Sequence, residues 1–135
     1  MFEQILIGVK EDGPLDELVE LATSVASAGA NIHLATLVRV GNDGDERLRA
    51  DRAQERLDGA VRSLEGQGFR SASSVAFMAA LAGTELVRLA EQRGADLMVV
   101  GLVKRSRVGK ALLGSDAQSV LLGAPCPVLC LRPDA

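Results

Sequence analysis

The segment "ADLMVVGLVKRSRVGKALLGS", residues 95–115, joins a short apolar run to a basic loop with three glycines. The run at 95–101 predicts a buried strand. Strands of a parallel sheet are covered on both faces, so they are continuously apolar and lack the alternation of apolar and polar residues seen in half-exposed strands. The loop carries four cationic side chains and no acid: Lys104, Arg105, Arg107 and Lys110. Ser115 and Gln118 then form an S-x-x-Q capping box, which predicts a helix that ends at Gly123.

The rest of the chain repeats this strand–helix order. Apolar runs predict strands at residues 2–9, 31–40, 73–78 and 126–131. Helices are predicted from Pro14 to a C-terminal cap at Gly29, over 46–66 with a solvated charged face, and from an N-cap at Thr84 to Arg93, before Gly94. Five strands alternating with four helices predict one domain, 1–135, with an α/β fold: an open five-stranded parallel sheet with helices on both faces.

A ligand crevice is expected at the carboxyl ends of these strands. In open parallel sheets, ligands bind where the strand order reverses. The first and fourth strands are the expected neighbours at that point. Their pairing would bring Lys10–Pro14 beside Gly101–Ser115, so the basic loop would lie at the favoured position for a ligand.

The composition narrows the range of partners that can be expected. The chain has 135 residues, a formal net charge of −3 and only 2% aromatic residues, with neither Tyr nor Trp. Proteins that coat nucleic acid are generally basic, and single strands are usually held on aromatic rings, so nucleic acid is not an expected partner. No apolar run reaches the roughly 18 residues of a membrane span, and no signal-peptide pattern opens the chain. We therefore expect a cytoplasmic protein without a membrane partner.

Neither the cysteines nor the histidine indicates catalysis. Cys126 and Cys130 would lie about 13 Å apart along one strand, too far for a disulfide, and are expected to be reduced thiols. The only histidine, His33, falls several positions before the end of its predicted strand, where a packed or edge role is expected. Asp12 and Asp16 are explained as charges at a helix N-terminus. No nucleophile–base pair or metal-ligand set can be assembled, so we expect binding and not turnover.

The basic loop matches neither of two common phosphate-binding motifs. Its Gly109-Lys110 pair resembles the end of G-x4-G-K-S/T, but Lys104 stands where the first glycine belongs and Ala111 where the hydroxyl belongs. The G-x-G-x-x-G fingerprint is absent. What remains is a helix N-terminus at Ser115, whose free amides attract anions. Two interpretations stay open at this point: an anion site, or a plain helix cap beside solvated charges.

Four stretches together are typical of one family: "ILIGV", "GADLMVVG", the loop ending in "LLGS", and "APCPVLCL". On these the chain resembles the universal stress protein family over its whole length, which implies a Rossmann-like fold similar to the adenine nucleotide alpha hydrolases. The nucleotide-binding branch of that family has a loop of the form G-x2-G-x9-G-S/T. Gly101 and the Gly114-Ser115 pair match its first and last parts, whereas Lys104 replaces its second glycine. Lys10 stands where that branch has an aspartate that contacts adenosine.

The resemblance therefore implies a site with weakened selectivity for adenosine. Lys104 adds bulk where the backbone would approach phosphate, and Lys10 replaces an acceptor of ribose hydroxyls by a cation. The candidate binding residues are Lys10, Gly101, Lys104, Arg105, Gly109, Gly114 and Ser115.

Three functions follow as hypotheses. The first is a cytoplasmic stress-response regulator that acts as a homodimer and has a weakened or lost ATP site that still takes small anions. The second is a functional ATP-binding protein with the phosphates held by the 101–115 loop. The third, a flavin or electron-transfer relative, is disfavoured because neither crevice loop offers an aromatic ring. The homodimer is expected through the last strand, since "PVLCL" is apolar on both faces and a terminal strand exposes its edge. The resemblance implies antiparallel pairing across a two-fold axis.

Overall fold

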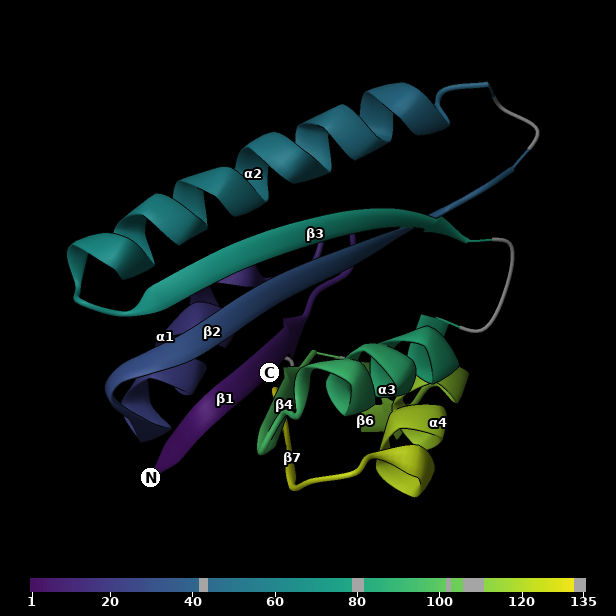
Figure 1. Cartoon of the computed structure of the whole chain (residues 1–135). Helices are drawn as coiled ribbons and strands as arrows, with labels where there is room; N and C mark the ends of the chain where they lie inside the picture. The colour runs from purple at the N-terminus through teal and green to yellow at the C-terminus, as the bar shows by residue number, and fades with distance from the viewer. Residues whose placement is uncertain (42–43, 79–81, 102, 106–110, 133–135) are drawn as a thin grey trace.

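A central sheet of five parallel strands in the order β3-β2-β1-β4-β7 organises the computed structural model (Figure 1). The structure describes residues 1–135 except 42–43, 79–81, 102, 106–110 and 133–135, and for 103–105 and 111–113 it describes the backbone alone. The strands are β1 (Phe2–Gly8), β2 (Ala26–Arg39), β3 (Arg70–Met78), β4 (Leu97–Val100) and β7 (Val128–Cys130). The helices are α1 (Leu15–Val25), α2 (Glu46–Gly66), α3 (Ala82–Arg93) and α4 (Ser115–Gly123). The predicted fold class is confirmed.

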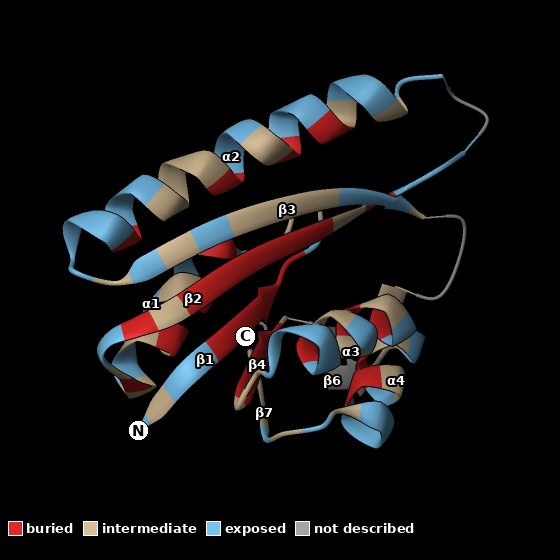
Figure 2. Cartoon of the chain, viewed as in Figure 1, coloured by how far each residue is buried: buried red, intermediate tan, exposed pale blue. Residues whose placement is uncertain are grey.

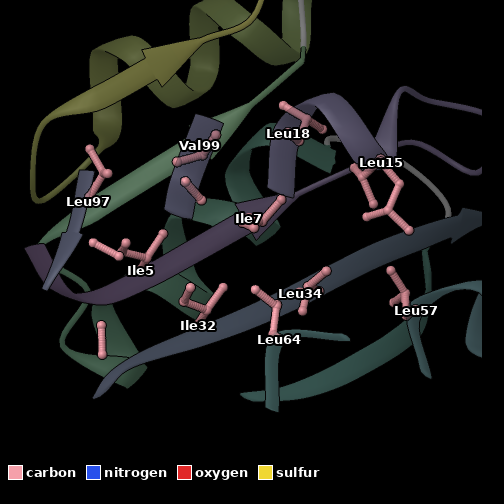
Figure 3. Packing of buried hydrophobic residues seen from close by; sticks show 14 residues of the cluster. Ile5, Ile7, Leu15, Leu18, Ile32, Leu34, Leu57, Leu64, Leu97 and Val99 are labelled. Carbon is pink, nitrogen blue, oxygen red and sulfur yellow. The ribbon is translucent and has the colours of Figure 1, made fainter. Parts of the chain in front are cut away.

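Helices cover both faces of the sheet. In Figure 1, α2 lies over β3 and β2 on one side, and α3 and α4 lie together on the other side. Consecutive residues of β1 enter different cores because side chains alternate along a strand: Ile5 and Ile7 join the cluster on the α1–α2 side, and Leu6 joins the cluster on the α3–α4 side. Figure 2 shows β4, the carboxyl half of β1 and most of β2 as buried. Figure 3 shows how the leucines of α1 and α2 meet β1, β2 and β4.

The end of the first helix was predicted wrongly. Helix α1 ends at Val25, and β2 begins at Ala26, so Gly29 lies in the strand with a φ of +73° and does not cap a helix. The hydroxyls of Thr23 and Ser24 donate to the carbonyls of Glu20 and Leu21 at 3.0 and 2.6 Å. Hydroxyl and β-branched residues are weak helix formers, because their side chains compete for backbone partners or lose rotamer freedom. Thr23, Ser24 and Val25 are three such residues in a row, and the helix ends at the last of them.

Two predicted caps are also wrong. Thr84 lies inside α3, which begins at Ala82, and the backbone N–H of Gly83 donates instead to a carboxylate oxygen of Asp116 at 3.2 Å. Ser115 is the first residue of α4, and the N-cap position belongs to Gly114, which has no side chain to form the predicted capping box. Glycine is acceptable at this position because its backbone reaches the required extended conformation without strain. The predicted ends of α3 at Arg93 and of α4 at Gly123 are confirmed.

The loop after β4 contains an antiparallel pair of short strands that the sequence did not predict. Strand β5 (Val103–Arg105) pairs with β6 (Ala111–Leu113), with Lys104 opposite Leu112. The chain therefore leaves the sheet and folds back before it enters α4. In the described part of the chain, no helix has the length and apolar character needed to cross a bilayer.

Candidate functional site

The crevice forms where β1 and β4 end side by side. Gly8 pairs with Val100, so Lys10 and Gly101 leave the sheet at the same edge, as the sequence predicted. A Cβ added at Gly101 would lie 3.7 Å from the side chain of Pro14 and 3.6 Å from that of Leu18. The start of the basic loop therefore lies close to the segment that leads from β1 into α1.

A cavity of about 230 Å³ opens at this edge, with charged walls. Lys10 is exposed and lines it from the loop after β1. Arg39 lines it from the end of β2, and Asp116 lines it from α4. A smaller pocket of about 30 Å³ beside it has an apolar floor of Val9, Leu37 and Leu86. The N-terminus of α4 thus reaches the same space as Lys10.

Asp116 is the crevice residue that sequence reasoning missed. Its carboxylate accepts the Gly83 N–H at 3.2 Å and so ties the first turn of α3 to the first turn of α4. It also places a negative charge on the wall that Lys10 shares. The sequence signal that could have identified Asp116 is an acid directly after the Gly114-Ser115 pair. In a helix's first turn an acid is usually explained by the helix dipole alone.

Two arginines of α2 hold the loop that carries Lys10. Arg49 binds both carboxylate oxygens of Glu11 at 2.8 and 3.0 Å and donates to the carbonyl of Arg39 at 2.9 Å. Arg56 donates to the carbonyls of Glu11, at 3.2 Å, and Gly13. The interpretation of this helix face as purely solvated is therefore wrong at these positions. A single guanidinium nitrogen of Arg49, Nη1, contacts both carboxylate oxygens, and this ion pair together with the arginine–carbonyl hydrogen bonds holds the loop in place.

The structure describes the remaining predicted binding residues only in part. Lys104 and Arg105 belong to β5, where the backbone alone is described, and Gly109 lies outside the described residues. Gly114 and Ser115 form the start of α4 at the crevice. The structure thus brings Lys10, Gly101, Gly114 and Ser115 to one edge of the sheet.

His33 lies away from the crevice, near the middle of β2. It is 8% exposed, and its Nε2 lies 2.8 Å from the Ser74 hydroxyl. Burial, together with the positive charge of Arg93, lowers the pKa of His33 to about 4. The ring is therefore neutral at neutral pH, in keeping with the packed role expected from the sequence.

The cysteines do not form a reactive pair. Cys126 and Cys130 are both free thiols, as predicted. Burial raises the pKa of both thiols, and the charge of Asp96 raises that of Cys126 further. A thiol with a raised pKa is a poor nucleophile at neutral pH. Within the described residues, no three His, Cys, Asp or Glu side chains gather as a metal site would require.

Comparisons with known proteins agree with this architecture. A universal stress protein of Mycolicibacterium smegmatis is 47% identical over 49 residues, and that segment covers 36% of this chain and 38% of the relative. The chain thus matches well under two thirds of that relative's length. The structure of a universal stress protein from Archaeoglobus fulgidus superposes with a TM-score of 0.73, at 24% identity, and covers 98% of this chain and 100% of that one.

A second Archaeoglobus fulgidus structure was determined in complex with dAMP. It superposes with a TM-score of 0.66 at 21% identity and covers 97% of this chain and 98% of that chain. These two likenesses confirm the fold. The model of the universal stress protein family matches residues 1–132. The family match covers nearly the whole chain and agrees with the parallel sheet and its strand order. The chain therefore belongs to the universal stress protein family.

Proposed function

We propose that this chain is a cytoplasmic regulator of the universal stress type, which works as a homodimer and has a weakened ATP site that still takes small anions. One observation supports it above all: Lys10 and Asp116 face the same crevice cavity. An ammonium group cannot accept hydrogen bonds from ribose hydroxyls, and the Asp116 carboxylate repels the larger charge of a triphosphate more strongly than that of a single small anion. The cavity of about 230 Å³ is also small for ATP.

The charge balance favours a small anion over a nucleotide. Within the described lining, Lys10 and Arg39 oppose Asp12 and Asp116, while Glu11 is paired with Arg49. The basic loop adds four cations and no acid by sequence. Free amides at the start of α4 supply directional donors. A phosphate group alone fits this combination better than adenosine does.

Phosphate and sulfate are therefore expected to raise the melting temperature at constant ionic strength, and adenosine is not. Binding to the native state alone stabilises it by mass action, and each kcal/mol shifts the melting temperature by about 3–5 °C in a chain of this size. The double variant Lys10→Gln/Lys104→Gln should lose most of the anion effect. Scanning calorimetry would measure both proteins. Equal stabilisation by adenosine and ATP, or an anion effect untouched in the double variant, would count against the proposal.

The homodimer is expected through the outer edge of β7. This strand is an edge of the sheet, next to β4. The Leu131 N–H donates to Val100 at 2.8 Å and the Pro127 carbonyl accepts from Met98 at 3.0 Å. By strand alternation, the backbone groups of Val128 and Cys130 then point outward. They are available for a second copy.

Cys130→Pro is therefore expected to break the dimer while it leaves the pairing of β7 with β4 in place. It removes one outward N–H, and its effect should be a dissociation constant raised at least about tenfold, equivalent to about 1.4 kcal/mol. Sedimentation equilibrium at micromolar concentration gives the readout, with circular dichroism as the control for folding. A monomeric unmodified protein would refute the dimer and leave the crevice proposal standing.

The alternative function is a fully competent ATP-binding protein. It is favoured by the dAMP complex of the Archaeoglobus fulgidus relative and by the match of Gly101, Gly114 and Ser115 to the nucleotide-binding loop. In that case the phosphates would rest on the 101–115 loop. Calorimetry with ATP, described in the Discussion, separates the two functions.

A further inference from the structure

A second cavity lies at the opposite end of the sheet from the crevice. It measures about 390 Å³ and opens at the amino ends of β1, β2 and β3, beside the last turn of α3. We call it the amino-end cavity. Its polar lining comprises Gln4, Asn31, His33, Arg70, Ser71, Gln92 and Arg93. Figure 1 shows α2 above β3 and β2, with α3 and α4 on the opposite side of the sheet.

His33 gives the amino-end cavity a buried polar wall. Strand pairing sets it in one row with Leu6 and Ala72, which also line the cavity. Its Nε2 contacts Ser74, while its buried Nδ1 has no hydrogen-bond partner in the described structure. Buried polar atoms are nearly always paired, so Nδ1 of His33 is an exception among the described residues, and it belongs to a residue that lines the cavity.

Two guanidinium groups reach the amino-end cavity from different elements. Arg70 begins β3 and Arg93 ends α3. Neither of them forms a salt bridge or side-chain hydrogen bond with the described residues. Arg93 is close enough for its charge to act on His33. Guanidinium groups that lack a protein partner and line one cavity are suited to bind an oxyanion.

Opposing charges at this end are weaker than the two arginines. The carboxylate of Asp96 already accepts the backbone N–H groups of Glu3 and Gln4, each at 2.9 Å. The C-terminal end of α3 contributes about half a negative charge. Among the residues that line the amino-end cavity, Arg70 and Arg93 carry the formal charges, and both are positive.

We propose that the amino-end cavity binds a small organic anion, with a carboxylate or phosphate group held between Arg70 and Arg93. The amides of Gln4, Asn31 and Gln92 supply hydrogen bonds for the body of the ligand, and Leu6 and Ala72 supply apolar contact. The volume is at the lower end of the roughly 300–1,000 Å³ typical of small-molecule sites, which fits a metabolite and not a polymer. This site is separate from the crevice and does not depend on its function.

The single histidine makes the test specific, because its ring C–H signals in a proton NMR spectrum belong to His33 alone. Citrate and inorganic phosphate are titrated separately at constant ionic strength. Either anion is expected to shift the His33 signals saturably; a response to citrate alone assigns a carboxylate ligand, and one to phosphate assigns a phosphate ester. The variant Arg70→Gln/Arg93→Gln should weaken the apparent affinity at least tenfold.

The crevice variant Lys10→Gln is the matched control and should leave the His33 titration unchanged. Because Arg70 and Arg93 are exposed, their replacement should preserve the fold, which circular dichroism checks. If neither citrate nor phosphate shifts the His33 signals saturably, the proposal is overturned. So would a shift of equal affinity in the double-arginine variant, or one that Lys10→Gln abolishes.

Discussion

Replacing Gly83 by alanine is expected to lower the free energy of unfolding by about 3 kcal/mol. A Cβ at this position would lie 2.5 Å from the backbone oxygen of Asp116 and 2.8 Å from the Cβ of Ser119. Neither atom is the far end of a flexible side chain, so α3 and α4 must separate. Overpacking of this kind typically costs about 1–3 kcal/mol, and weakening of the Gly83–Asp116 hydrogen bond adds about 1 kcal/mol.

Gly59→Ala is the matched control for this effect. Gly59 lies in the middle of α2, where an added Cβ would meet only the end of Arg62 at 3.9 Å. Alanine there should stabilise the protein by about 0.5–1 kcal/mol, because it restricts the unfolded chain and favours helix. Urea unfolding of both variants measures the difference. A Gly83→Ala variant as stable as the unmodified protein would show that the two helices do not meet so closely.

Acid is expected to destabilise the protein through His33, by about 2 kcal/mol between about pH 7.5 and about pH 5. The folded pKa of about 4 is lower than the ordinary value of 6.5. The unfolded chain therefore binds a proton first as the pH falls, and stability decreases from about pH 6.5 down to pH 4, with one pKa unit equal to about 1.4 kcal/mol. Burial of the ring is the main cause of the lowered pKa, and the positive charge of Arg93 adds to it; Arg70 is the other charged group that lines the cavity.

His33→Gln isolates this effect, because glutamine can still bond to Ser74 but does not titrate. Its stability should be nearly flat over the same interval, where few carboxylates have begun to titrate. Urea unfolding at several pH values gives both slopes. A variant with the same loss of stability as the unmodified protein would show that other groups cause it.

The sheet could be predicted from the sequence because its signals are local. An apolar run, or an apolar stripe on a charged helix, shows from adjacent residues which positions are buried. Such patterns around Ile5, around Val99 and over 46–66 correctly predicted β1, β4 and α2. The pairing of β1 with β4 followed from the order of strands and helices. It correctly brought Gly101 near Pro14.

The remaining features depend on contacts between distant parts of the chain. Gly83 receives its cap from Asp116, 33 residues away, so the hydroxyl of Thr84 was a misleading signal. The pairing of Arg49 with Glu11 joins residues 38 apart, and a helical wheel can show only that Arg49 lies on a charged face. The amino-end cavity needs three strands and a helix in place before it exists. No local pattern in the sequence carries that information.

The central claim is that Lys10 and Lys104 weaken the ATP site, and titration calorimetry with ATP at physiological ionic strength tests it most directly. The unmodified protein is expected to bind ATP weakly, with a Kd in about the 0.1 mM range or above. Lys10→Asp/Lys104→Gly should tighten binding by about one to two decades, because a restored carboxylate–hydroxyl bond contributes about 1.5–3 kcal/mol. Loss of the Lys10 charge offsets part of that gain, more so at low salt. A low-micromolar Kd for the unmodified protein that the double change leaves unaltered would contradict the account.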